Sequence, residues 1–82
     1  MTITMTELVS VSNDGMLELN YSCRTSRVTY SIADLTGNIL LTGMYDCEEK
    51  NKKIEIHNLP RGFFLLYIVD GGSLIRTHFQ KH

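Results

Sequence analysis

Three histidines are the side chains whose chemistry could support a metal site. They are His57, His78 and His82, and a neutral imidazole is a common metal ligand in proteins. On one β-strand, His78 and His82 would lie about 13 Å apart, which is too far for both to bind the same ion. We therefore interpret the histidines as exposed polar positions, and the sequence predicts no metal site.

Two cysteines offer a second kind of chemistry. Cys23 and Cys47 could form a disulfide in an oxidising compartment, but two cysteines are too few for a disulfide scaffold. The sequence favours two half-buried free thiols. Asp46, Glu48 and Glu49 flank Cys47, yet no spaced pair of further ligands completes a four-coordinate zinc site.

Catalytic and cofactor motifs are absent from the sequence. A Cys/His nucleophile would need a third, orienting group and a cleft, and no local signature of either is present. The net charge is −1 and the isoelectric point is near 6.2, whereas a nucleic-acid-binding protein normally has a basic face. We expect a protein that is not an enzyme, needs no cofactor and does not bind nucleic acid.

Short β-strands must position these side chains. Alanine occurs once, and β-branched and aromatic residues dominate the apolar runs, which is typical of strands. Alternating polarity between turn signals predicts strands at Thr2–Val11, Met16–Cys23, Arg27–Asp34, Ile39–Asp46, Ile54–Asn58, Phe63–Val69 and Ser73–Gln80. Seven such strands predict an all-β fold, a seven-stranded immunoglobulin-like antiparallel β-sandwich, with a small barrel as the alternative. At 82 residues, we expect residues 1–82 to form a single domain.

Two of the predicted strands depart from simple alternation. In the fourth, Ile39, Leu40 and Leu41 are all apolar, which fits either a central strand covered on both faces or a strand that bends or bulges near Gly43. The sixth, Phe63–Val69, is apolar on both faces. Either its outer face is shielded by neighbouring side chains or the N-terminal segment, or an exposed stripe there contacts a partner or a second copy.

The beginning of the chain, MTITMTELVS, has neither a basic segment nor an apolar run, so it does not resemble a signal peptide. No window approaches the roughly 18 apolar residues that a membrane span needs. Either the protein starts natively at Met1 in the cytoplasm, or Met1 marks the place where a leader was removed.

The segment NLPRGFFLLYIVDGG, residues 58–72, resembles the C-terminal sorting domains of the Bacteroidetes type IX secretion system. In that family a Leu-Pro-x-Gly turn precedes an apolar strand and a glycine turn, and the last strand ends in a Phe-x-Lys-like tail, here Phe79-Gln80-Lys81. The segment VTYSIADLTGNI, residues 28–39, is similar to a second family motif, Val-x-Ile-x-Asp-x-x-Gly-x-x-Val. A related group, the small secreted immunoglobulin-like domains of Bacteroides, resembles this chain at GMLELNY, residues 15–21.

The resemblance implies a non-catalytic role in the cell envelope or outside the cell. A sorting domain would be recognised by protein-export machinery. The alternative is a free-standing secreted or surface accessory domain that binds protein or glycan, and a native start at Met1 would favour a cytoplasmic interaction module.

The expected partner is a protein, either secretion machinery or a surface partner, and a homodimer is a further possibility. The expected location is the periplasm, the cell surface or the medium. The residues expected to bind the partner lie on the last two strands and at the C-terminal tail: Phe63, Leu65, Tyr67, Val69, Arg76, His78 and Lys81.

Overall fold

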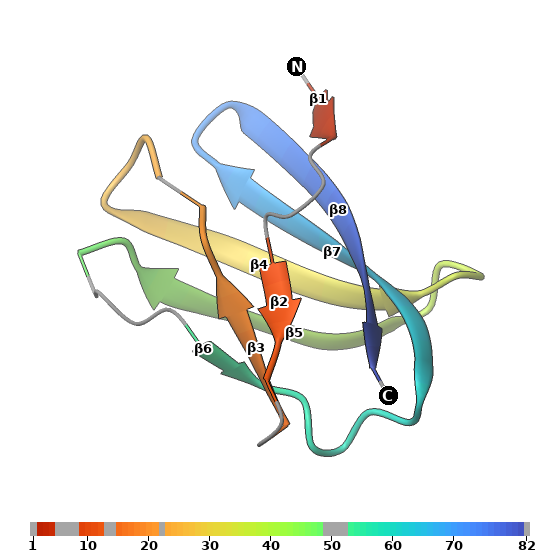
Figure 1. Ribbon diagram of the computed structural model, residues 1–82. Coiled ribbons are helices and arrows are strands. Elements are labelled where there is room, and N and C mark those ends of the chain that lie inside the picture. The colour runs from red at the N-terminus through yellow and green to blue at the C-terminus, as the bar shows by residue number, and fades with distance from the viewer. Residues whose placement is uncertain (1, 5–8, 13–14, 22, 49–52, 82) are drawn as a thin grey trace.

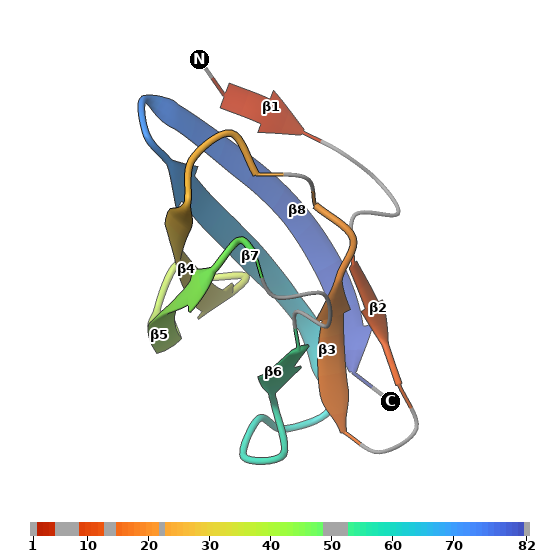
Figure 2. The same cartoon turned by 90° about the vertical axis from the view of Figure 1, so that its left-hand side faces the viewer.

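The computed structural model describes residues 2–4, 9–12, 15–21, 23–48 and 53–81, and these residues form strands in two facing sheets (Figures 1 and 2). The larger sheet has the order β1-β8-β7-β4-β5 and consists of β1 (Thr2–Thr4), β8 (Ser73–Lys81), β7 (Gly62–Asp70), β4 (Arg27–Asp34) and β5 (Ile39–Asp46). The smaller sheet has the order β2-β3-β6 and consists of β2 (Val9–Val11), β3 (Met16–Leu19) and β6 (Lys53–Glu55). None of the described segments is helical, so no membrane-spanning helix is found among them.

This arrangement confirms the predicted all-β, immunoglobulin-like sandwich. Every described strand pair is antiparallel except β1 with β8. In the immunoglobulin pattern, β5 occupies the place of the extra strand that variable-type domains add beside strand C. The predicted first strand is divided between the sheets, because β1 pairs with β8 whereas β2 pairs with β3.

Two predicted strands are shorter than their polarity pattern suggested. The second strand ends at Leu19 instead of Cys23, and the fifth ends at Glu55 instead of Asn58. Ile56 is nevertheless fully buried just after β6. A side chain can therefore be buried two residues after Ile54, as a strand would place it, although the backbone no longer pairs with a neighbouring strand.

The blurred alternation at Ile39–Leu41 has a specific cause. The register between β4 and β5 shifts so that Ile32 faces Leu41 and Ala33 faces Ile39, which leaves Leu40 without a partner on β4. The strand is an edge strand of the larger sheet and is not central. Of the two interpretations of this segment, the bulge is correct, but it lies at Leu40, three residues before Gly43.

The core lies between the two sheets, where alternate residues of each strand point inward. On β7 and β8 these are the even and the odd positions respectively, as the burial of Leu66, Ile68 and Ile75 shows. The buried cluster comprises Leu17, Leu19, Val28, Ile32, Ile54, Ile56, Leu59, Phe64, Leu66, Ile68, Ile75 and Phe79. Because apolar surface removed from water contributes about 25 cal/mol per Å², this cluster is the main source of stability.

The expectation of free thiols is wrong, because Cys23 and Cys47 form a disulfide. Cys23 lies between β3 and β4, and Cys47 directly follows β5. A backbone hydrogen bond from Cys47 to the Ser26 carbonyl, 2.9 Å long, holds the end of β5 against the segment before β4. The two Cα atoms are 5.9 Å apart, which is within the ordinary range for a disulfide.

Candidate functional site on the outer face of β7 and β8

The outer face of β7 and β8 gathers most of the residues predicted to bind a partner. The strands pair so that Leu65 faces His78 and Tyr67 faces Arg76, and directly opposed side chains in an antiparallel pair lie within contact range of each other. We call this surface the β7–β8 face and define it by Phe63, Leu65, Tyr67, Val69, Leu74, Arg76 and His78. Six of the seven predicted residues therefore share one surface.

The sequence allowed either a shielded outer face on β7 or an exposed apolar stripe, and the observed exposure falls between these two. Leu65 and Tyr67 are half-buried, whereas Phe63 is 54% and Val69 47% exposed. The strand is central, with β8 on one side and β4 on the other, and β1 lies beside β8 in the same sheet. The middle of the stripe is thus half-buried, and its two ends are accessible.

Charge on the β7–β8 face has one sign. Arg76 is exposed beside Tyr67, and none of the residues that define the face is acidic. An arginine next to an aromatic ring can bind a carboxylate and pack on the ring at the same time. The arrangement suits an apolar surface that carries carboxylates.

Lys81 lies on the opposite side of the sheet from the other predicted residues. Its register partner is Gly62, and its Nζ donates hydrogen bonds to the carbonyl oxygens of Ile56, His57 and Leu59 at 2.7, 3.2 and 2.6 Å. The ammonium group therefore fixes the turn that follows β6 to the end of β8, and it supports the site from within the chain.

A buried carboxylate fixes the hairpin that joins β7 to β8. Asp70 is 2% exposed and ends β7 directly before the turn at Gly71 and Gly72. Its oxygens accept hydrogen bonds from Tyr21 Oη (2.6 Å), Arg24 N (2.7 Å), Thr25 N (3.1 Å) and Thr25 Oγ1 (2.5 Å). The carboxylate thereby ties the hairpin to the segment that also carries Cys23.

The hydrogen bonds to Asp70 have electrostatic consequences on both sides. Burial alone would raise the pKa of Asp70, but the donors from Arg24, Thr25 and Tyr21 outweigh it and lower the pKa to about 2. Burial, followed by the hydrogen bond to Asp70, raises the pKa of Tyr21 to about 12. Both groups therefore keep one protonation state at neutral pH, so the network acts as a structural anchor.

The structure adds no grouping of metal ligands. His57 follows β6 and His78 lies on β8, while His82 lies outside the described residues. Within the described ranges, no three side chains from histidine, cysteine, aspartate and glutamate are grouped as a metal would require.

Sequence reasoning missed the network around Asp70, and it named the neighbouring disulfide only as the less favoured alternative. The Asp-Gly-Gly sequence indicated a turn, but the carboxylate's partners are 45 to 49 residues away. Only the tertiary fold brings them together. The one available signal was an acidic residue at the end of a strongly apolar strand, where burial demands partners.

Comparison with known protein families agrees with the fold and with the C-terminal motifs. Residues 12–81 match the family described as the secretion system C-terminal sorting domain. No curated protein matches the sequence significantly. The family is defined by sorting and not by a catalytic activity, and the match runs from the turn before β3 to the end of β8. The chain belongs to the C-terminal sorting domain family of the type IX secretion system.

Proposed function

We propose that this chain directs export through the type IX secretion system, and that the machinery recognises its folded β7–β8 face. The family match over residues 12–81 carries the proposal. In this role the domain catalyses nothing, and its partner is a protein component of the machinery. Its destination is the cell surface or the medium.

The surface itself supports recognition by a protein. Phe63 and Val69 expose large apolar side chains at the two ends of the stripe, and Arg76 lies between them on the neighbouring strand. Aromatic residues and arginine are the types most enriched at the energetic centres of protein interfaces. Carboxylates of the partner would pair with Arg76 while its apolar side chains cover Phe63 and Val69.

The disulfide supports the proposed location. Disulfides form and persist in oxidising environments such as the periplasm and the cell exterior, and they are rare in the cytosol. Cys23 and Cys47 are both bonded, so the folded form suits a protein that has left the cytoplasm.

A reporter-export experiment tests the proposal. Residues 1–82 are fused behind a reporter that carries a signal peptide, and the reporter is assayed in the medium and on the surface of a host with the type IX machinery. The matched variants are Arg76→Glu, on the β7–β8 face, and Arg61→Glu, at the exposed turn before β7. Both should fold, which circular dichroism of the purified domains checks.

We expect the parent fusion and the Arg61→Glu fusion to be exported. The Arg76→Glu fusion should be retained in the periplasm, with export reduced by about tenfold, the effect of losing about 1.4 kcal/mol of recognition. Retention of the parent fusion would overturn the sorting role. Normal export of Arg76→Glu would overturn the assignment of the surface.

A further inference from the structure

The edge of the larger sheet at β5 is a second surface with binding features. Among the described strands β5 pairs with β4 alone, so it forms an edge of the larger sheet. Edge strands are commonly protected by lysine, by proline or by very short length. β5 is eight residues long, ILLTGMYD, and contains neither lysine nor proline.

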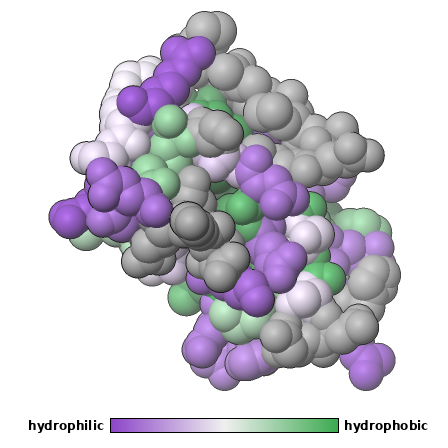
Figure 3. All heavy atoms as spheres, turned by 60° about the vertical axis from the view of Figure 1, so that its left-hand side comes forward, coloured by the Kyte–Doolittle hydropathy of each residue, from purple (hydrophilic) through white to green (hydrophobic). Residues whose placement is uncertain are grey.

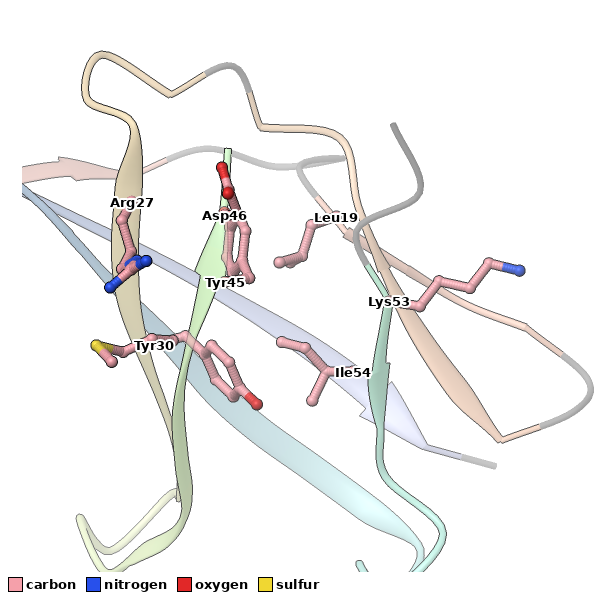
Figure 4. Close-up of a pocket in the computed structure, with 8 residues that line it drawn as sticks. Leu19, Arg27, Tyr30, Tyr45, Asp46, Lys53 and Ile54 are labelled. Carbon is pink, nitrogen blue, oxygen red and sulfur yellow. The ribbon is translucent and has the colours of Figure 1, made fainter. Parts of the chain in front are cut away.

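Two hollows lie beside this edge, between β5 and the smaller sheet. The first has a volume of about 390 Å³. Leu19, Tyr30, Tyr45 and Ile54 line it together with Met44 and the charged residues Arg27, Asp46 and Lys53. Figure 4 shows the two tyrosines facing Leu19 and Ile54 across the gap. The second has a volume of about 280 Å³ and lies near the start of β5, where Leu40, Leu41, Ile56, Leu59 and Pro60 line it. The same side of the molecule shows apolar atoms between hydrophilic ones in Figure 3.

The spacing of the hollows matches the repeat of a strand. Tyr45 and Leu41 face the buried residues Val28 and Ile32 on β4, so both point toward the gap between the sheets. Directly opposed residues in an antiparallel pair project to the same face. A strand added to β5 would therefore place side chains four residues apart into the two hollows.

We propose that β5 is a strand-addition site for an extended segment of a partner protein. The segment pairs antiparallel with β5, and two of its apolar side chains, four residues apart, enter the hollows beside Tyr45 and Leu41. Backbone hydrogen bonds to an edge strand supply affinity in this mode of recognition, and side-chain pockets supply specificity. This surface is separate from the β7–β8 face, so the inference goes beyond the proposed function.

Charge distinguishes a foreign segment from a second copy of this chain. Glu55 is exposed at the second hollow, which favours a basic residue directly after the second apolar one in the incoming segment. In an antiparallel self-pairing centred on Gly43, Asp46 of one copy would face Leu40 of the other, because both lie three residues from the centre. That arrangement places a carboxylate beside Glu55, so β5 itself is a poor occupant.

The close approach of Tyr30 to Gly43 fits the same site. These residues are paired in the β4–β5 register, and a Cβ at position 43 would lie 2.5 Å from the Tyr30 hydroxyl oxygen. Glycine therefore lets the tyrosine ring lie across β5 at the wall of the first hollow. The residue of the incoming strand that pairs with Gly43 must be small, since the Tyr30 ring occupies the space above Gly43.

A synthetic nine-residue peptide, Thr-Thr-Phe-Thr-Ser-Thr-Leu-Lys-Thr, provides the probe. It places phenylalanine and leucine four residues apart, a small residue between them and a lysine directly after the leucine. The ¹⁵N-labelled 82-residue chain is titrated with this peptide and followed by NMR. We expect saturable shifts at the amides of residues 39–46 and no shifts on β8, whereas a scrambled peptide should give none. Absence of saturable binding would overturn the proposal.

Two N-methylated forms of the peptide test for backbone pairing. Each form carries methyl groups on alternate nitrogens, so that only one form loses the donors that face β5. We expect one form to bind at least about tenfold more weakly, a loss of about 1.4 kcal/mol, and the other to bind like the parent peptide. Equal affinity of both forms would show simple apolar adsorption and would overturn the pairing.

A matched pair of variants tests the position. Leu40→Lys places a cation at the second hollow, and Leu35→Lys makes the same change at the exposed turn between β4 and β5. Binding should weaken by about tenfold in the first variant only, while both keep a dispersed spectrum. Sedimentation of the chain without peptide completes the test: a dimer that Leu40→Lys dissociates would show that a second copy occupies the edge, and the proposal would be wrong.

Discussion

At the scale of single residues, Asp70 shows how a sheet protein of this size can bury a charge. Its carboxylate accepts hydrogen bonds from three residues that precede β4, so the cost of removing it from water is offset within the chain. Removing a buried carboxylate is destabilising, because the N–H and O–H groups that donated to it remain shielded from water without an acceptor.

Replacing Asp70 with asparagine should therefore destabilise the protein by about 2–3 kcal/mol. The amide nitrogen would face N–H and O–H donors in place of an acceptor. Urea denaturation measures the effect. Asp46→Asn is the control: Asp46 is exposed and its Oδ1 accepts one hydrogen bond, from Glu48 N, which asparagine can keep. A loss of less than about 0.5 kcal/mol in both variants, as is typical of surface positions, would contradict the anchoring role.

The same carboxylate predicts a pH dependence. The pKa of Asp70 is lowered from its ordinary 3.8 to about 2 in the folded protein, so the unfolded chain takes up the proton first as the pH falls. The stabilisation by Asp70 is complete above about pH 4 and is lost as the pH falls from 4 toward 2. Thermal unfolding of the parent and of Asp70→Asn between pH 6 and 2 tests this, because the two curves should converge at low pH. A constant difference across that range would count against it.

At the scale of elements, the disulfide joins the end of β5 to the segment before β4. The cysteines are separated by 24 residues in the sequence, and a cross-link over a loop of that length lowers the entropy of the unfolded chain. The same segment carries the donors to Asp70. The β3–β4 connection is therefore held from two sides, by β5 and by the β7–β8 hairpin.

Removing the disulfide by the double change Cys23→Ser and Cys47→Ser should cost about 3 kcal/mol in the free energy of unfolding. Calorimetry of the variant, and of the parent with a reducing agent, measures this cost. The reductant should have no effect on the variant. Equal stability of the parent with and without reductant would show that the cross-link does not stabilise the fold.

The bounds of the four long strands were predictable from the sequence, whereas the pairing of the short strands and the disulfide were not. β4, β5, β7 and β8 agree with their predicted bounds within one residue, because turn residues such as Gly37 and Gly71 delimit them. The division of the first strand between two sheets, the bulge at Leu40 and the Cys23–Cys47 bond depend on which strands become neighbours. Local polarity carries no information on that choice. Both faces of β7 are apolar in the sequence, so the burial of its even-numbered residues is known only from the fold. The internal role of Lys81 likewise required the position of the turn that follows β6.

At the scale of the whole molecule, pairing is uneven across the larger sheet. Among the described strands, β7 has a long partner on each side, whereas β5 pairs with β4 alone. Amides that are paired on a central, buried strand require larger openings for exchange than those on an edge.

Hydrogen exchange should therefore be slowest on β7 and on the strands that flank it. The inward-facing residues Leu66 and Ile68 are fully buried, so their surroundings open only with global unfolding. Those amides of β5 that do not pair with β4 should exchange fastest among the strands of this sheet. NMR exchange at pH 6 measures the order, and uniform protection across the sheet would be inconsistent with the described topology.

The position of β8 has a consequence for protein synthesis. The last nine described residues, 73–81, form a strand between β1 and β7, supply Ile75, Thr77 and Phe79 to the interior, and carry the ammonium group that holds the turn after β6. A ribosome that stops before Ser73 releases a chain that lacks three of the seven residues of the β7–β8 face and part of the interior. If the machinery reads that face, it also checks that the domain has been translated through β8, and a chain cut before this strand would carry no valid export label.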